Sequence, residues 1–224
     1  GDGGDEIFGG YNWYKKFERI KNKNRPSLRF LRPSLQILQK YHIFRRLSKK
    51  LERAFLLDDL EIYTILMSGM LKEQKEKYKK LWGIDHNYDD YWYFRKYYRE
   101  ELNLYTRLQY LDFHTFLPDN CLSKVDRTSM NVSLECRVPL LSKDIIEYCF
   151  SLKDEVRIHD SELKGAMKEA FREILPDEIL TRDKKGFSAP VTNVFKLLKL
   201  NSGTQQEKYL HRFFDLYKEH IQTP

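Results

Sequence analysis

Hydrophobic residues recur at three- and four-residue steps along most of the chain, which predicts a mainly helical protein. The first of these patterns predicts a helix from about Asp5 to Ile20. Its apolar face comprises Ile7, Phe8, Tyr11 and Tyr14. The Asn and Pro residues of 22–27 end this helix. Leucines at 28, 31, 35 and 38 then predict a second helix, with Pro33 near its start.

The middle of the chain continues the helical pattern. A third helix is expected over about 43–55, and Asp58 or Asp59 is placed to cap a fourth. The inner face of the fourth helix is expected to hold Ile62, Leu66 and Met70. Residues 72–81 are strongly charged and are expected to be exposed. Two more helical stretches follow between 88 and 117.

Pro118 is expected to end the last of these stretches, because proline disrupts a helix interior. Residues 119–141 mix polar and apolar positions without an amphipathic stripe, so the sequence predicts irregular structure there. This segment ends at Val138-Pro139, where the residue before proline is restricted to extended conformations.

The last third of the chain returns to helical spacing. A helix is predicted over 143–151, and Ser161 is placed to cap another, which Pro176 stops. The inward residues of that helix are expected to be Leu163, Met167, Ala170, Phe171 and Ile174. A basic loop over 182–190 precedes two shorter helices near 191–199 and 206–221. Without repeats or low-complexity linkers, these elements predict one compact helical unit.

Composition narrows the class of protein only slightly. The 224 residues suffice for one sizeable core or two small ones, and no apolar run reaches the length of a membrane span. The net charge of +7 raises the question of nucleic-acid binding, but no nucleic-acid recognition motif supports it. The basic cluster of Arg45, Arg46, Lys49, Lys50 and Arg53 has helical spacing and is interpreted as a solvated helix face. No membrane partner is expected.

Two groups of residues are interpreted as structural. Cys121, Cys136 and Cys149 lack metal or disulfide spacing, so they are expected to be free thiols in a reducing compartment, hence the cytoplasm. A dense aromatic block is expected to pack between helices rather than stack on bases. It comprises Tyr91, Trp92, Tyr93, Phe94, Tyr97 and Tyr98.

The first ten residues, Gly-Asp-Gly-Gly-Asp-Glu-Ile-Phe-Gly-Gly, carry the strongest chemical signal. Glycines at 1, 3 and 4 permit a positive φ and let a ligand approach the main chain. Helix amides favour phosphate, whereas Asp2 and Asp5 would repel it unless Mg²⁺ bridges them. Alternatively, one acid serves as a general base, or the segment is a surface turn in which Asp5 caps the following helix.

Three segments, taken in order, resemble one family. Residues 1–11 look like the second nucleotide loop of the glutamine-hydrolysing asparagine synthetases. The Leu-Pro-Asp-Asn of 117–120, Lys124, Asp126-Arg127, Ser129-Met130 and the Leu-Glu-Cys-Arg-Val-Pro-Leu-Leu of 134–141 look like its central signature. Arg182, Lys184, Gly186 and Phe187 look like its late lysine loop. Residues 25–105 carry little of the resemblance.

The resemblance implies the mainly helical C-terminal portion of an adenine-nucleotide-binding α/β synthetase domain of the ATP pyrophosphatase type. Over residues 1–224 we find neither the family's Ser-Gly-Gly-x-Asp-Ser pyrophosphate loop nor its N-terminal glutaminase domain. The chain is therefore expected to be part of a larger protein and to be inactive alone. The oligomeric state is left open, with a homodimer as one option.

The reaction implied by the resemblance is ATP-dependent amide formation. Aspartate attacks the α-phosphate of MgATP, pyrophosphate leaves, and ammonia from glutamine displaces AMP from β-aspartyl-AMP. Relatives that amidate sugars or antibiotic precursors, and a binding protein that has lost catalysis, remain alternatives. ATP and Mg²⁺ are the implied cofactors.

The resemblance also implies roles for individual residues. Gly1 would lie against the nucleotide, Asp2 would orient or deprotonate the nitrogen nucleophile, and Asp5 would bind magnesium pyrophosphate. Some members carry Glu at the Asp2 position. Lys184 would contact the phosphates, while its neighbour Lys185 serves as a control.

Two pairs of residues in the central signature are each open to a structural interpretation. Asp126 and Arg127 could pair with the ammonium and carboxylate of a substrate amino acid, or form a structural ion pair. Glu135 and Arg137 are interpreted as a buried brace.

Overall fold

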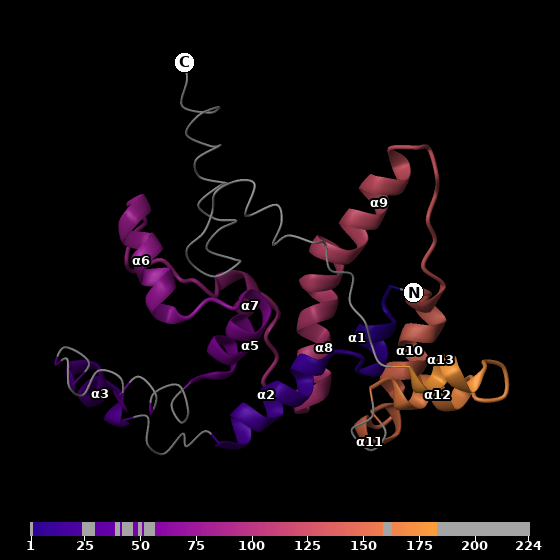
Figure 1. Cartoon of the computed structure of the whole chain (residues 1–224), viewed down its shortest axis with the longest axis horizontal. Helices are drawn as coiled ribbons and strands as arrows, with labels where there is room; N and C mark the ends of the chain where they lie inside the picture. The colour runs from indigo at the N-terminus through magenta and orange to yellow at the C-terminus, as the bar shows by residue number, and fades with distance from the viewer. Residues whose placement is uncertain are drawn as a thin grey trace. The chain divides into compact units, whose positions relative to one another are not determined.

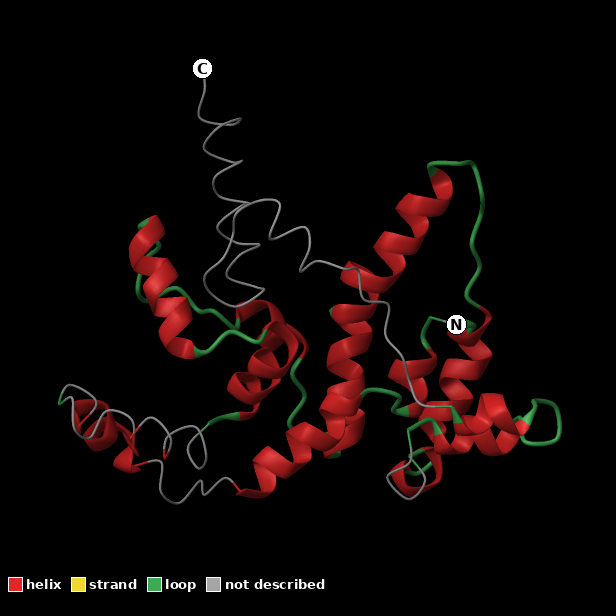
Figure 2. Cartoon of the chain, viewed as in Figure 1, coloured by secondary structure: helices red, strands yellow, loops and turns green. Residues whose placement is uncertain are grey.

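The computed structural model describes residues 2–23, 30–38, 41, 47–48, 51, 57–158 and 163–182. Within these ranges the chain is mainly helical and contains no strand, which confirms the predicted fold class (Figure 2). The chain divides into two compact units rather than the single unit expected. The first contains Gly1–Leu66 and Asn87–Leu180, and the second contains Met67–His86 and Thr181–Pro224.

The first unit is built from short helices (Figure 1). In order they are α1 (Gly4–Phe8), α2 (Asn12–Lys23), α3 (Arg32–Leu38), α5 (Asp59–Ser68), α7 (Trp92–Tyr97), α8 (Leu104–His114), the π-helical turn η2 (Leu117–Leu122), α9 (Ser123–Met130), the 3₁₀ turn η3 (Pro139–Leu141), α10 (Lys143–Ser151), α11 (Asp154–Arg157), α12 (Gly165–Ala170) and α13 (Asp177–Thr181). Helix α10 has the predicted bounds. The predicted helix over 43–55 lies almost entirely outside the described residues, as do those near 191–199 and 206–221.

The predicted first helix is interrupted. Gly9 ends α1 with a left-handed φ of 66°, and its N–H bonds back to the carbonyl of Asp5. Gly10 also donates to the Asp5 carbonyl, at 2.8 Å. This glycine C-cap stops the helix, and α2 begins at Asn12 on a new axis. The continuous helix predicted over residues 5–20 is therefore wrong.

Helix α5 begins as the sequence predicts. The Asp58 carboxylate accepts the Glu61 N–H at 2.7 Å, and the Glu61 carboxylate accepts the Asp58 N–H at 2.9 Å. These reciprocal bonds form a capping box, which satisfies two amides that the helix leaves open. The helix ends at Ser68 before Gly69, whose φ is 66°. Met70 therefore lies beyond α5 and not on its inner face, contrary to the prediction.

Helix α8 lies at the centre of the first unit and contacts α1, α7 and η2. Its buried face holds Leu108 and Leu111, together with two polar residues, Gln109 and Asp112. The Asp112 carboxylate accepts hydrogen bonds from Tyr14 at 2.6 Å, Tyr63 at 2.5 Å and Trp13 at 3.1 Å. This buried carboxylate thus joins α2, α5 and α8.

The chain remains helical beyond Pro118, contrary to the prediction. Pro118 lies in the first turn of η2, where its missing N–H would have no helical partner in any case. Helix α9 follows directly, so only residues 131–138 of the segment predicted as irregular lack helical structure.

Helix α12 is shorter than predicted. It ends at Ala170, and Ile174 is 72% exposed although its position predicted an inward side chain. Helix α13 over Asp177–Thr181 was not predicted. Ser161, the predicted cap, lies outside the described residues.

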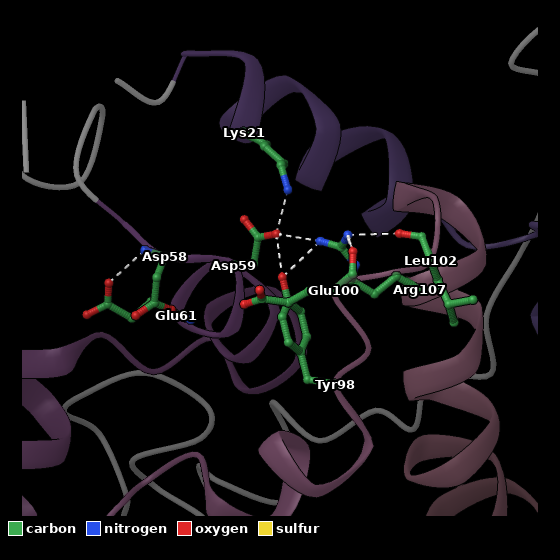
Figure 3. A network of polar contacts seen from close by, with 8 residues as sticks. All are labelled: Lys21, Asp58, Asp59, Glu61, Tyr98, Glu100, Leu102 and Arg107. Carbon is green, nitrogen blue, oxygen red and sulfur yellow. Dashed lines mark hydrogen bonds and ion pairs between the residues drawn. The ribbon is translucent and has the colours of Figure 1, made fainter. Parts of the chain in front are cut away.

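A second polar network joins four segments of the first unit (Figure 3). The Asp59 carboxylate accepts from Lys21 at 2.5 Å, Tyr98 at 2.7 Å and Arg107 at 3.2 Å. Arg107 also donates to the Tyr98 hydroxyl at 2.9 Å, the Leu102 carbonyl at 2.8 Å and the Glu100 carbonyl at 2.5 Å. The arginine therefore fixes α8 to the start of α5 and to the loop after α7, and Asp59 in turn joins α2 through Lys21.

The aromatic block packs against neighbouring helices in part. Phe94 meets Tyr63 edge-on with ring centroids 5.3 Å apart, and Tyr97 stacks on His114 at 5.0 Å. Trp92, in contrast, is 55% exposed. Packing between helices is thus confirmed for Phe94 and Tyr97 and is wrong for Trp92.

Within the second unit, the described residues form helix α6 (Lys72–Trp82). Tyr78 and Lys79 are buried, and Tyr78 stacks on Trp82 with ring centroids 4.7 Å apart. The predicted exposure of residues 72–81 is therefore wrong for Tyr78 and Lys79. None of the helices in the described ranges is long and apolar enough to cross a membrane.

Candidate active site

The glycine-rich turn precedes α1 and places its acids in the first helical turn. Gly3 has a φ of 85°, in the left-handed region, and its carbonyl accepts the Ile7 N–H at 3.0 Å. Asp5 and Glu6 follow inside the helix. Asp5 is therefore not the N-cap that the sequence predicted, and no side chain caps α1.

The turn packs directly against the end of the central signature. A Cβ added to Gly3 would lie 2.2 Å from Cδ2 of Leu141, and one added to Gly4 would lie 3.0 Å from Cδ1 of Leu140. The structure therefore brings two of the three sequence segments together. Both the positive φ of Gly3 and its close approach to the Leu141 side chain therefore favour glycine at this position. Approach of a ligand to Gly3 and Gly4 stays a prediction.

Lys164, which sequence reasoning missed, lies beside the same turn. Its Nζ is 3.3 Å from Oδ1 of Asp5. A Cβ at Gly10 would lie 2.0 Å from that Asp5 oxygen and 2.5 Å from Cε of Lys164. Helical spacing had assigned only its apolar neighbours to a role, and nothing local distinguishes Lys164 from the chain's other lysines.

Glu6 is a buried carboxylate, only 1% exposed. It accepts a hydrogen bond from the Tyr11 hydroxyl at 2.5 Å. Burial raises the pKa of Tyr11 well above its usual value, and the neighbouring Glu6 raises it further. Tyr11 therefore acts as a neutral donor, and Glu6 supports the turn from within the core.

Cys121 lies close to this pair from η2. Burial and the charge of Glu6 raise the pKa of its thiol, whereas a hydrogen bond with Tyr11 lowers it; the net shift is upward. The Asp2 charge adds to the rise. Cys121 is therefore a neutral thiol near pH 7. The three cysteines are free, as predicted.

The remaining signature residues are more exposed. Asp126 and Arg127 lie exposed on α9 and, although both are described, form no ion pair with each other. Their role in substrate binding stays a prediction. Glu135 and Arg137 pair at 3.0 Å, but their side chains are 70% and 83% exposed, so the predicted buried brace is wrong. Gly1, Lys184, Lys185, Gly186 and Phe187 lie outside the described residues.

The acids of the turn suit a metal that arrives with its ligand. In the described ranges, no group of three or more His, Cys, Asp or Glu side chains could hold a metal ion. Mg²⁺ is commonly held by one or two carboxylates plus substrate phosphates rather than by a protein cage. Asp5, half-buried at the turn, fits that mode of binding.

A separate cavity of about 430 Å³ borders the Asp59 network. Its lining comprises Asp58, Asp59, Leu60, Arg95, Tyr98, Glu100 and Arg107. The Asp59 and Arg107 side chains there already bond to each other (Figure 3). This cavity therefore belongs to the structural network described above.

The part of the chain that the structure describes is thus mainly helical, and its acidic glycine turn packs on residues 140–141. The model of the asparagine synthase family matches residues 1–212. The chain belongs to the asparagine synthase family.

Curated relatives support this assignment. The chain is 29% identical over 232 residues to asparagine synthetase [glutamine-hydrolyzing] 1 of Bacillus subtilis (strain 168), covering 96% of this chain and 35% of the relative. It is 40% identical over 81 residues to asparagine synthetase [glutamine-hydrolyzing] 3 of the same strain, covering 36% of this chain and 13% of the relative. The Rattus norvegicus asparagine synthetase [glutamine-hydrolyzing] is 40% identical over 83 residues, covering 34% and 15%.

The chain thus spans about a third of the length of asparagine synthetase [glutamine-hydrolyzing] 1 of Bacillus subtilis. No solved structure matches it.

Proposed function

We propose that this chain is the helical part of a synthetase domain that makes asparagine from aspartate, ATP and ammonia released from glutamine. The observation that carries the proposal is the packing of the acidic glycine turn against Leu140 and Leu141 in a member of the asparagine synthase family. Two segments far apart in the sequence thereby lie side by side.

The proposed reaction has two steps. The side-chain carboxylate of aspartate attacks the α-phosphorus of ATP, and the bond to pyrophosphate breaks. Ammonia then attacks the activated carbonyl, the bond to AMP breaks, and the nitrogen loses a proton. Asp2 is the base assigned to that proton, and Asp126 with Arg127 is assigned to the ammonium and carboxylate of aspartate.

The first step requires stabilisation of the negative charge on the phosphates. Mg²⁺, when bound, would neutralise phosphate charge and polarise the phosphoryl oxygens. Asp5 is the residue assigned to hold it, Lys184 is assigned to the phosphates, and the backbone of Gly1, Gly3 and Gly4 is assigned to the nucleotide. Fixed charges of this kind stabilise developing charge because they need no reorganisation during the reaction.

The glutaminase domain of the same protein is the proposed source of ammonia. The three free cysteines are compatible with a reducing compartment, and we propose the cytoplasm. No nucleic-acid or membrane partner is part of the proposal, and a homodimer is compatible with it.

The test is aspartate-dependent pyrophosphate release by the full-length protein, with MgATP and ammonium supplied. Ammonium bypasses the glutaminase step. We expect asparagine as the product and loss of pyrophosphate release in Lys184→Ala, with Lys185→Ala as the matched control. If the folded protein binds ATP but releases no pyrophosphate with aspartate, the acceptor is another molecule, such as a sugar or an antibiotic precursor. If ATP does not bind, a non-catalytic relative replaces the proposal.

A further inference from the structure

Lys164 reaches the glycine-rich turn from the other end of the described chain. Its Nζ lies 3.3 Å from Oδ1 of Asp5 and 3.8 Å from the position of a Cβ at Gly4. Its Cε lies 2.5 Å from the position of a Cβ at Gly10. The lysine side chain therefore runs along the backbone of two glycines, which lack the side chains that would exclude it.

The backbone of Lys164 is held in an unusual conformation. Its φ of 58° and ψ of 30° lie in the left-handed region. This conformation is unfavourable for any residue that carries a side chain. Its carbonyl accepts the Lys168 N–H at 2.9 Å, and helix α12 contacts α1. The surrounding structure thus compensates for the strain, and strained residues of this kind cluster at functional sites.

The ion pair remains accessible to solvent. The side chains of Lys164 and Asp5 are 28% and 21% exposed. By comparison, the Arg157 side chain that pairs with Asp154 is only 1% exposed. Solvent and salt screen the charge of an ammonium in this half-buried position less than that of a surface lysine. A ligand can still reach it.

From this geometry we propose that Lys164 contacts pyrophosphate oxygens of the bound nucleotide, and that Asp5 holds its ammonium at the turn before the nucleotide arrives. The inference rests on the proposed function. A lysine suits this exchange because it is a compact charge on a flexible stem, able to turn from a carboxylate to a phosphate. It would be a second phosphate-binding lysine, besides Lys184.

The test is calorimetric titration of the full-length protein with inorganic pyrophosphate in the presence of Mg²⁺. Lys164→Met keeps the apolar stem beside Gly10 and removes the charge. We expect this variant to bind pyrophosphate at least about tenfold more weakly, because a charge-assisted hydrogen bond is lost. Lys164→Arg keeps the charge and should retain most of the affinity.

The matched control is Lys143→Ala. Lys143 also pairs with a carboxylate, that of Glu147 at 3.7 Å, but on the exposed face of α10. Pyrophosphate affinity should not change in this variant. Thermal unfolding of each variant reports separately whether the fold is retained.

A double-variant experiment separates direct contact from positioning of Asp5. This experiment uses pyrophosphate without Mg²⁺, because Asp5 is also the residue assigned to hold the metal. In an Asp5→Asn background, Lys164→Met should still weaken pyrophosphate binding. If it causes no further loss there, Lys164 acts only through Asp5 and the proposal is wrong. Unchanged affinity of the single Lys164→Met variant would also overturn it, while leaving the proposed function intact. Failure of the unaltered protein to bind pyrophosphate would overturn both.

Discussion

At the scale of single residues, Gly3 shows how packing constrains the candidate site. Its φ of 85° disfavours any side chain, and a Cβ would lie 2.2 Å from Leu141. Gly3→Ala should therefore lower the free energy of unfolding by about 2–4 kcal/mol, from backbone strain together with overpacking. Urea unfolding followed by circular dichroism measures this loss.

Gly83→Ala is the matched control for Gly3→Ala. Gly83 has a φ of 66°, but nothing lies within 4 Å of its added Cβ. Only backbone strain is incurred there, so the expected loss is about 1 kcal/mol. Equal losses of unfolding free energy at the two glycines would show that the Leu141 side chain moves aside without destabilising the fold. That result would contradict the packing argument.

Asp112 should make stability depend on pH. Burial raises the pKa of this carboxyl from 3.8 to about 7. Hydrogen bonds from Tyr14, Tyr63 and Trp13 favour the charged form and lower the pKa, but the effect of burial is larger. The folded state therefore holds a proton that the unfolded state releases, and this contribution to stability is lost as pH rises through about 7.

We expect Asp112→Asn to flatten the fall in stability between pH 3.8 and about 7. The difference in the free energy of unfolding across this interval should reach up to about 4 kcal/mol. Chemical unfolding of both proteins along a pH series measures it. Asp144→Asn, on the exposed face of α10, is the control and should leave the slope unchanged. If the pH dependence of stability persists in Asp112→Asn, other titrating groups cause it.

At the scale of elements, Asp59 and Arg107 together join four segments of the first unit (Figure 3). Burial tends to raise the pKa of Asp59, but hydrogen bonds from Lys21 and Tyr98 and the charges of Lys21 and Arg107 lower it overall. The Asp59 contribution to stability is therefore present at neutral pH and is lost as pH falls through its lowered pKa.

Arg107→Ala should lower the free energy of unfolding by about 3 kcal/mol, because it leaves a half-buried carboxylate with fewer donors. Arg95→Ala provides a control at the edge of the same cavity. Arg95 is 60% exposed and pairs with Asp89, so its loss should cost only about 0–1 kcal/mol. Similar losses in the two variants would show that the network does not stabilise the junction.

At the scale of the whole molecule, family membership extends over nearly the entire chain, whereas the chain spans about a third of its relative. We predict that residues 1–224, expressed alone, show no aspartate-dependent pyrophosphate release from MgATP and ammonium. We expect this because the Ser-Gly-Gly-x-Asp-Ser pyrophosphate loop, which the resemblance assigns to the family, is not found in residues 1–224. The same assay on the full-length protein is the positive control, and robust activity of residues 1–224 would contradict the prediction.

Local patterns predicted what depends on local physics. Apolar periodicity predicted the helical class and the bounds of α10, and the Asp58 cap of α5 followed from residue chemistry alone. The break at Gly9 and the helical continuation beyond Pro118 escaped prediction. A glycine pair permits a turn without requiring it, and a proline is compatible with both the start and the end of a helix.

The sequence by itself determined the helical composition, the family and the residues that carry charge at the glycine-rich turn. Only the tertiary structure decided which of these groups meet. Lys164 joins Asp5, Leu141 closes on Gly3, and Asp112 gathers Tyr14 and Tyr63. Helical spacing reports the face on which a residue lies, whereas contacts between distant segments depend on how those faces pack. The pairing partners of buried and half-buried charges therefore cannot be read from local sequence.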